Sequence, residues 1–368
     1  FLSHGMDKKL LIVILVTLIC ALSFGRSFLG LIGAIPWHYG YSDIFNEDRI
    51  NPEAAKKIPY LESPIEYPVI TGFFIYAMWH LGRNLLGYAV LTGVFLTLFA
   101  VITATILYRL CDESNTDKKR IYMFFIFAPS LVIFGIYNWD IIAVMLTALA
   151  IYSFYKSKYA WSALFLALGF SAKLFPIVLL PIMLLKTGIK NAVKMVIVFL
   201  AVFFILNGYF IANSFDVWKA TYGFHAARGA NIDSVWSLSS LSASTINIVS
   251  LILFLASYFI LVYNHKKYDL ITLGFASVLL FLIFNKIFSP QYILWLLPFF
   301  VLSQNTSKKT FYFLEAANMV VFFSTMLWLL ASKEQIFLAI SNISTIARSI
   351  ILAYLVFEVL RPKSLYIT

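Results

Sequence analysis

Charged side chains are scarce in this chain of 368 residues: Asp, Glu, Lys and Arg make up 12% of it, whereas 61% of the residues are hydrophobic. A soluble fold of this size needs more charge to cover its surface. The apolar residues gather in repeated runs of about 17–25 residues, the length at which an α-helix crosses a bilayer. The sequence therefore predicts an all-α polytopic membrane protein, with 36 Phe and 21 Tyr facing lipid and the membrane interfaces.

Cysteines and several common chemical motifs are also rare or missing. Of the two cysteines, Cys20 lies inside the first apolar run and Cys111 lies in a short polar loop, so we expect no structural disulfide. The sequence contains no His-Glu-x-x-His, no paired-cysteine spacing, no Walker loop and no GxGxxG. We therefore expect neither a metal nor another cofactor, and a soluble nucleotide is an unfavourable candidate for the substrate.

The net charge of +11 comes mainly from short basic loops. Such a charge is compatible with nucleic-acid binding, but the pattern favours loops on the cytoplasmic side that orient the helices, with no nucleic-acid partner. A threading with about twelve transmembrane helices places every one of these clusters on one side: Lys8/Lys9, Lys118–Arg120, Lys156/Lys158, Lys186/Lys190, Lys266/Lys267, Lys308/Lys309 and Arg361/Lys363.

The chain is predicted to be one integral membrane domain over residues 6–361, and the five residues before Met6 are interpreted as a cloning remnant. The first apolar run, residues 10–32, is interpreted as a retained helix rather than a signal peptide. Two large external loops follow, at residues 36–68 and 213–244. The run at residues 69–82 is short for a span, so a re-entrant or interfacial helix is expected there. Acidic residues in the first loop suggest juxtamembrane surface helices: Asp43, Glu47, Asp48 and Glu53.

The unusual polar residues converge on the external side of this threading, where a site is therefore expected. They are Asp43, Glu66, Asn138, Asp140, Lys173, His225, Arg228, Lys286 and Gln291.

Two helix starts on that side resemble each other. Lys173 precedes Pro176, and Lys286 precedes Ser289 and Pro290. A lysine beside an outward-facing helix N-terminus attracts an anion, and two such places suggest a shared phosphate. The alternatives are that Lys173 snorkels to headgroups and that Ser289 only caps a helix. Gln291 and Tyr292 add hydrogen-bonding groups in the first turn of the second helix.

Other candidates lie in the loops. Arg228, with His225 nearby, is suited to binding phosphate, although both could belong to a solvated loop. Asn138 and Asp140 could contact substrate or could only cap a helix. Asp43, flanked by aromatics, could act as a general base toward a hydroxyl or could only cap a turn.

Five stretches, in this order, resemble one known group. They are the acid of HYGYSDIFNED (38–48), EYP (66–68), NWD (138–140), KLFPIVLLP (173–181) and SPQYILWLLP (289–298). Together they are similar to the GT-C glycosyltransferases of family 87, which include polyprenol-phosphate-mannose-dependent mannosyltransferases. The resemblance covers residues 37–300, and the last two helices carry little of it.

The resemblance implies a polyprenyl-phosphate sugar as donor and transfer with inversion on the external face. By position it assigns the base to Asp43, with Glu66 and Asp48 as rivals. The leaving phosphate would then be stabilised by Lys173, Arg228, Lys286 and the helix start at Ser289, with His225 and Gln291 nearby. Tyr41 and neighbouring aromatics would pack on sugars, and Glu66 with Tyr67 would bind a sugar or hold a cation.

The sugar expected from the family is mannose, and the acceptor is a glycolipid or glycan. A composition rich in Ile, Phe, Lys and Asn suggests a prokaryote and hence its plasma membrane. Two other classes remain open at this point: a lipid-linked sugar flippase or transporter, and a lipid-linked oligosaccharide polymerase or ligase, which would use a diphosphate donor.

Overall fold

The computed structural model describes residues 7–46 and 56–361. These residues form helices and one isolated bridge, between Pro59 and Ser63, but no strand. Six helices are long and apolar enough to cross a membrane. They are α1 (Lys8–Leu31), α6 (Leu85–Glu113), α12 (Ile189–Asn213), α14 (Ala243–Tyr263), α17 (Lys308–Leu327) with its π-helical continuation η7 (Trp328–Ser332), and α18 (Gln335–Val359).

Shorter apolar helices fill the bundle between them. They are α5 (Val69–Gly82), α9 (Asp140–Tyr155), α10 (Tyr159–Phe170), η3 (Phe175–Val178) with α11 (Leu179–Leu185), α15 (Leu270–Phe284), and η6 (Pro290–Leu296) with α16 (Leu297–Leu302). The remaining elements are α2 (Trp37–Gly40), η1 (Asp43–Phe45), α7 (Lys119–Ile121), η2 (Tyr122–Ile126), α8 (Pro129–Phe134), α13 (Phe215–Ala227), η4 (Val235–Leu238) and η5 (His265–Lys267). The predicted all-α membrane fold is confirmed, whereas the count of twelve spans stays a prediction.

Two apolar helices, α14 and α15, differ sharply in burial. α15 is buried along nearly its whole length, whereas α14 buries only Ile246 and Leu261. The outer side of α14 leaves large apolar side chains exposed, such as Ile248 at 60% and Phe259 at 67%. A continuous apolar surface of this kind is unfavourable in water and favourable against lipid tails. α14 is therefore a lipid-facing helix, and α15 belongs to the centre of the bundle.

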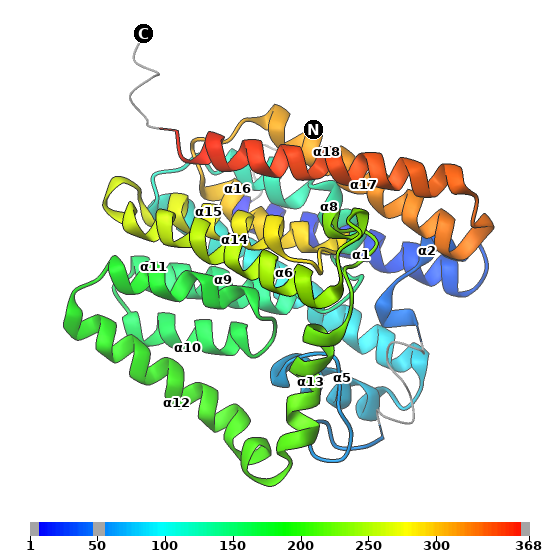
Figure 1. Ribbon diagram of the computed structural model, residues 1–368, viewed down its shortest axis with the longest axis horizontal. Coiled ribbons are helices and arrows are strands. Elements are labelled where there is room, and N and C mark those ends of the chain that lie inside the picture. The colour runs from blue at the N-terminus through cyan, green and yellow to red at the C-terminus, as the bar shows by residue number, and fades with distance from the viewer. Residues whose placement is uncertain (1–6, 47–55, 362–368) are drawn as a thin grey trace.

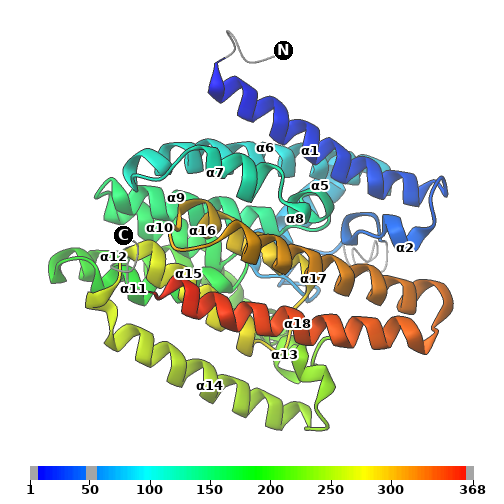
Figure 2. The same cartoon turned by 90° about the horizontal axis from the view of Figure 1, so that it is seen from above.

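The long helices run side by side along the horizontal direction of Figures 1 and 2, and the two ends of the bundle differ in charge. The α11–α12 turn, the α14–α15 turn and the end of α18 lie together at the left in both views. These segments carry Lys186, Lys266, Lys267 and Arg361, so we call this the basic end. α2 and the turn between η7 and α18 lie at the opposite end.

The first large loop is partly ordered into helices, as expected. α2 and η1 lie in it, whereas Glu47, Asp48 and Glu53 lie outside the described residues. α5, the expected short helix, is 14 residues or about 21 Å long, less than the bilayer core. A tight turn reverses the chain into α6, with Arg83 at φ 62° and Asn84 accepting a hydrogen bond from the backbone N–H of Gly87 (2.8 Å).

One expected span is broken. The apolar stretch at residues 121–137 is long enough for a continuous helix, but π-helical η2 and then Pro129, at the first turn of α8, interrupt it. Proline has no N–H to continue the helical ladder and disfavours helical geometry in the residue before it. The chain after α8 then turns through Tyr137 to reach α9, and this turn forms part of the site.

Candidate active site

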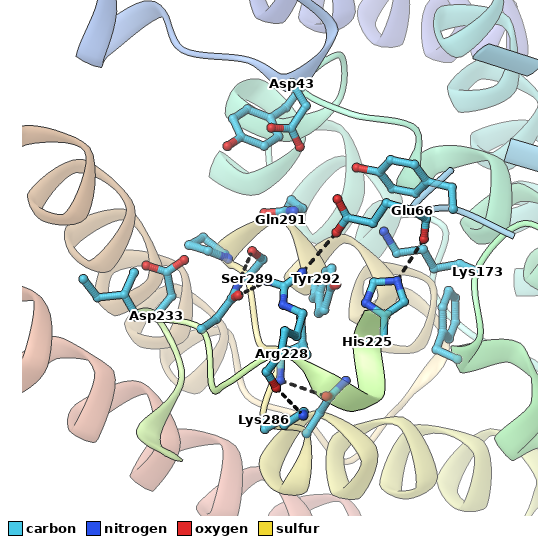
Figure 3. A pocket seen from close by; sticks show the side chains of 18 of the residues that line it. Asp43, Glu66, Lys173, His225, Arg228, Asp233, Lys286, Ser289, Gln291 and Tyr292 are labelled. Carbon is cyan, nitrogen blue, oxygen red and sulfur yellow. Dashed lines mark hydrogen bonds and ion pairs between the residues drawn. The ribbon is translucent and has the colours of Figure 1, made fainter. Parts of the chain in front are cut away.

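A cavity of about 590 Å³ gathers residues from segments far apart in the sequence. Eleven of the thirteen predicted site residues line it: Tyr41, Asp43, Glu66, Tyr67, Lys173, His225, Arg228, Lys286, Ser289, Gln291 and Tyr292. Figure 3 shows Asp43 and Asp233 at the top and left of the view, Lys173 and His225 at the right, and Arg228 and Lys286 below. The predicted convergence of an acid and several cations in one pocket is therefore present.

Asp43 is held at the pocket by the turn it begins. Its side chain accepts a hydrogen bond from the Tyr41 hydroxyl (3.1 Å), and the residue is only 6% exposed. The Ser42 hydroxyl donates to the carbonyl of Tyr137 (2.9 Å), which fixes the turn against the chain that leaves α8. Asn46 donates to the Tyr41 hydroxyl (3.2 Å). The carboxylate is therefore positioned in the pocket wall rather than in bulk solvent.

An arginine within α1 supports the same turn from behind. The Arg26 guanidinium donates to the carbonyls of Tyr39, Tyr41 (3.1 Å) and Ile133 (3.3 Å). A charge inside an apolar helix is costly unless its donors are satisfied. Arg26 therefore joins α1 to the two segments that carry Tyr41 and Tyr137, a function that its position in an apolar run did not reveal.

Lys173 is paired behind the pocket surface. Its ammonium group lies 2.6 Å from a carboxylate oxygen of Asp140, which is 1% exposed. The ammonium also lies 5.1 Å from the ring centres of Tyr67 and Tyr292, within cation–π range. Asn138 accepts a hydrogen bond from the backbone N–H of Asp140 (2.9 Å).

This arrangement corrects two predicted substrate contacts. Asn138 and Asp140 are buried and are not among the residues that line the cavity. Asn138 caps the start of α9, and Asp140 partly neutralises Lys173. The turn before α9 directs both side chains into the bundle. Asn138 therefore contacts the backbone of Asp140, and Asp140 contacts the pocket residue Lys173.

Glu66, Arg228 and His225 form a second paired group. Arg228 binds the Glu66 carboxylate (3.0 Å), and His225 Nε2 lies 2.9 Å from the Glu66 carbonyl oxygen. Burial lowers the pKa of His225; the hydrogen bond to Glu66 and its charge oppose this, and Arg228 and Lys173 add to the lowering. The lowered pKa favours the neutral form of the imidazole. Glu66, at the start of the apolar stretch before α5, accordingly serves as the partner of a basic residue.

Lys286 and Ser289 are tied to the loop after α13. The Lys286 ammonium donates to the carbonyls of Ala226 (3.1 Å) and Arg228 (2.5 Å). Asn231 donates through its side chain to the Ser289 hydroxyl (3.1 Å), donates through its backbone to the Lys286 carbonyl (3.0 Å), and accepts from Arg228. Asn231 thus links the predicted residues Arg228, Lys286 and Ser289. It was not predicted as a site residue, and the only sequence feature that pointed to it was its place in the same loop as Arg228.

The two predicted helix starts differ from long α-helices. The segments after Lys173 and Lys286 begin as 3-10 helices of four and seven residues. Ser289 occupies the N-cap position, but its side chain makes no capping bond. Fewer aligned peptide dipoles contribute at the N-termini of these short 3-10 helices, so they attract an anion less strongly than the N-terminus of a long α-helix. The charges of the nearby lysine side chains therefore contribute most of the attraction.

Asp233 and Arg348 were missed as site residues. Asp233 lines the pocket, and buried Arg348 of α18 donates to the Asp233 carbonyl and to the Asn318 side chain (2.7 Å). Asn318 in turn donates to the carbonyl of Pro290 (2.9 Å). Burial raises the pKa of Asp233 to about 6, against the opposing effects of Arg348 and the Thr325 hydroxyl.

The charges divide the pocket into two walls. The basic wall comprises Lys173, Arg228 and Lys286 with the carboxylates of Asp140 and Glu66, so among the described residues the cations of this wall outnumber its carboxylates. The acidic wall comprises Asp43 and Asp233, which both lie within electrostatic range of Tyr137. Among the described residues, no cluster of three His, Cys, Asp or Glu side chains could hold a metal.

The family model for glycosyltransferase family 87 matches residues 66–290, which include the whole basic wall. This chain belongs to glycosyltransferase family 87. Family 87 membership is consistent with a structural likeness to ArnT from Cupriavidus metallidurans, solved bound to undecaprenyl phosphate. That likeness has a TM-score of 0.51 at 10% identity and covers 96% of this chain and 78% of ArnT, which establishes the GT-C fold. Among curated proteins, no relative matches the sequence.

Proposed function

We propose that this membrane glycosyltransferase moves a sugar from a polyprenyl-phosphate donor to a hydroxyl of a lipid or glycan acceptor. The observation that carries the proposal is the pocket with two walls: an acid able to accept a proton faces the same 590 Å³ cavity as a cluster of cations. Glycosyl transfer needs both, because a proton leaves the acceptor while negative charge develops on the leaving group.

The charge of the basic wall supports a monophosphate donor. A polyprenyl-phosphate sugar is a phosphodiester with one negative charge, and the cations of the basic wall, which outnumber its carboxylates among the described residues, can receive it. The lipid chain has an apolar place near Met326, Leu329 and Leu330, which line the same pocket. The undecaprenyl phosphate bound by ArnT is a ligand of this chemical class.

The proposed reaction is a single displacement with inversion. The Asp43 carboxylate takes the proton from the acceptor hydroxyl, whose oxygen forms a bond to the anomeric carbon as the bond from that carbon to the phosphate oxygen breaks. The leaving polyprenyl phosphate keeps the electron pair and gains a second negative charge. Arg228 and Lys286 stabilise it, with Lys173 held nearby by Asp140. Tyr41 orients the carboxylate.

Finer assignments follow from the family. We propose mannose as the sugar, a glycolipid or glycan as acceptor, and the external face of a prokaryotic plasma membrane as the location. Tyr41 and Asp43, which line the pocket, directly follow α2, and Leu329 and Leu330 belong to η7. These elements lie at the end opposite the basic end, which the positive-inside rule would place outside. The protein cations supply the phosphate charge compensation for which other enzymes use a divalent metal.

The two competing classes fit the pocket less well. A lipid-linked oligosaccharide polymerase or ligase uses a diphosphate donor, whose larger charge calls for more cations than the three described in the basic wall. A flippase or transporter needs no acid positioned opposite a phosphate site, whereas Asp43 is fixed by Tyr41 and a capped turn.

The experiment uses the protein in lipid nanodiscs with radiolabelled polyprenyl-phosphate mannose and a lipid extract as the acceptor source. We expect transfer by the wild type and loss of at least about 100-fold in Asp43→Asn, with donor binding retained, because removal of a general base costs this much. Asp216→Asn, on the exposed side of α13, is the matched control and should transfer normally. Full activity of Asp43→Asn would exclude this base, and preference for a diphosphate donor would favour the ligase class.

A further inference from the structure

We propose that Asp233 binds a hydroxyl group of the acceptor, and that the acceptor moiety bound beside it is a neutral polyhydroxylated group such as a sugar or polyol rather than an anion. This inference rests on the proposed function and extends it to the second substrate. It concerns the acidic wall of the pocket, which the sequence patterns did not reveal.

The place of Asp233 is fixed through its backbone. Its carbonyl accepts a hydrogen bond from Arg348, and the next residue, Ser234, bonds through its N–H to the Asn231 carbonyl (2.8 Å) and through its hydroxyl to the Asn285 carbonyl (3.4 Å). The loop is thereby attached to α18 and to the segment that carries Lys286. The side chain lies at the cavity wall, with the Thr325 hydroxyl near its carboxyl group (Figure 3).

The carboxyl group itself is incompletely satisfied. Asp233 is 6% exposed, and its Oδ1 accepts no hydrogen bond from any described residue. The nearby Arg348 guanidinium is directed to the Asp233 carbonyl and the Asn318 side chain, and it stacks 4.0 Å from the ring centre of Phe288. A buried polar atom without a partner costs about 1–3 kcal/mol, which a ligand hydroxyl can recover by donating to it.

The neighbours of Asp233 indicate the class of ligand. The acidic wall offers the carboxylates of Asp43 and Asp233, with Tyr41, Tyr137 and Thr325 lining the cavity around them. Carboxylates accept hydrogen bonds from sugar hydroxyls and repel a phosphate or carboxylate, and the hydroxyls beside them can both donate to and accept from a sugar. The cations that would receive an anion belong to the basic wall, which the donor phosphate occupies in the proposed reaction.

The test measures the two ligands separately on the full-length protein in nanodiscs. Methyl α-mannoside serves as the neutral probe and mannose 6-phosphate as the anionic one, both followed by saturation-transfer NMR, and undecaprenyl phosphate serves as the donor-side probe in equilibrium binding. We expect the wild type to bind methyl α-mannoside better than mannose 6-phosphate. Asp233→Ala and the shape-preserving Asp233→Asn should weaken the neutral probe, by at least about tenfold for alanine, and leave undecaprenyl phosphate affinity within twofold.

Retained undecaprenyl phosphate binding shows that each variant is folded at the pocket, and Asp216→Asn is again the control. Unchanged binding of the neutral probe in both variants, or no binding by the wild type, would overturn the proposal. Loss of undecaprenyl phosphate binding in both variants would place Asp233 in the donor half, which also contradicts it. If turnover disappears while both affinities persist, Asp233 is the base instead. Failure of the proposed function has a different outcome, because the wild type would then neither bind undecaprenyl phosphate nor transfer sugar.

Discussion

A lysine inside an apolar run is easily identified in a sequence. Its energetic role, however, depends on a partner residue that lies elsewhere in the sequence. Lys173 was predicted as a phosphate-binding cation, and in the structure its ammonium group lies 2.6 Å from buried Asp140. The pattern of lysine before proline predicted the place of the charge. It did not predict that the charge is largely compensated, because the pairing depends on how the turn before α9 meets the end of α10.

The Lys173–Asp140 pair allows a stability prediction. Asp140→Asn should destabilise the protein by about 3–5 kcal/mol, because it leaves a buried ammonium without its counter-ion. The double variant Asp140→Asn with Lys173→Met removes both charges and should recover most of that loss. Thermal unfolding in detergent followed by tryptophan fluorescence measures both. A double variant no more stable than Asp140→Asn alone would show that the pair is not the source of the effect.

Asp233 gives a pH dependence whose sign can be worked out. Burial raises its pKa to about 6, above the ordinary value near 4, with Arg348, Thr325 and Tyr137 facing it from α18, α17 and the turn before α9. At a pH between these two pKa values, the Asp233 carboxyl is deprotonated in the unfolded chain and still protonated in the folded chain. Stability from this group therefore falls as the pH rises from about 4 to about 6 and is constant above that.

Asp233→Asn cannot ionise and should escape this loss. We expect its thermal midpoint to match the wild type near pH 4 and to exceed it by a few degrees at pH 8. Asp216→Asn, on an exposed carboxylate, should track the wild type at both values. Equal midpoints of Asp233→Asn and the wild type at pH 8 would show that the Asp233 carboxyl is not destabilised in the folded state.

Residues that join distant segments could not be predicted from their local patterns. Asn231 bonds Ser289, 58 positions away, and Arg348 bonds the carbonyl of Asp233, 115 positions away. Neither residue lies in a recognisable motif. By contrast, Lys286 and Ser289 precede Pro290 within five residues, so that cluster was visible as a local pattern.

At the scale of elements, α1 and α2 meet through two glycines. A Cβ on Gly30 would lie 2.7 Å from the Gly40 Cα, and a Cβ on Gly40 would lie 2.5 Å from the Gly30 Cα. Gly33, at φ 74°, allows the turn between the helices. The close approach places α2, and the Tyr41–Asp43 segment directly after it, against the first membrane helix.

This contact can be tested with one added methyl group. Gly30→Ala should destabilise the protein by about 1–3 kcal/mol and reduce transfer, because the backbone of α2 and the following Asp43 turn must shift. Gly25→Ala on the same helix has no atom within 4 Å of the new Cβ and should be neutral or slightly stabilising. Equal behaviour of the two variants in thermal unfolding and transfer assays would contradict the role of the crossing.

Helices were predicted well where apolar length alone decides them. The first run, expected at residues 10–32, is α1 over Lys8–Leu31, and the short run at residues 69–82 is α5 with the same bounds. Breaks within spans were harder to predict. η2 and η3 depart from α-helical geometry beside proline-containing segments, and which carbonyls lose their partners there depends on packing in the bundle.

At the scale of the whole molecule, two patterns agree. The segments that carry Lys186, Lys266, Lys267 and Arg361 lie at one end of the bundle, and α2, directly before the cavity residues Tyr41 and Asp43, lies at the other (Figures 1 and 2). The predicted gathering of polar residues in one cavity is present, whereas the external location of that cavity and the twelve-span threading stay predictions. The division of the cavity into an acidic and a basic wall lay beyond the sequence, since it depends on the hydrogen bonds of the loop at residues 228–234.

The most direct test of the central claim is a cryo-electron microscopy structure of the protein with undecaprenyl phosphate bound. The account predicts the phosphate against Arg228 and Lys286, with the lipid chain passing Leu329 and Leu330 and with Asp43 facing the space beyond the phosphate. A phosphate bound outside this cavity, or bound in it with Asp43 turned away, would contradict the claim that one pocket unites the base with the leaving group.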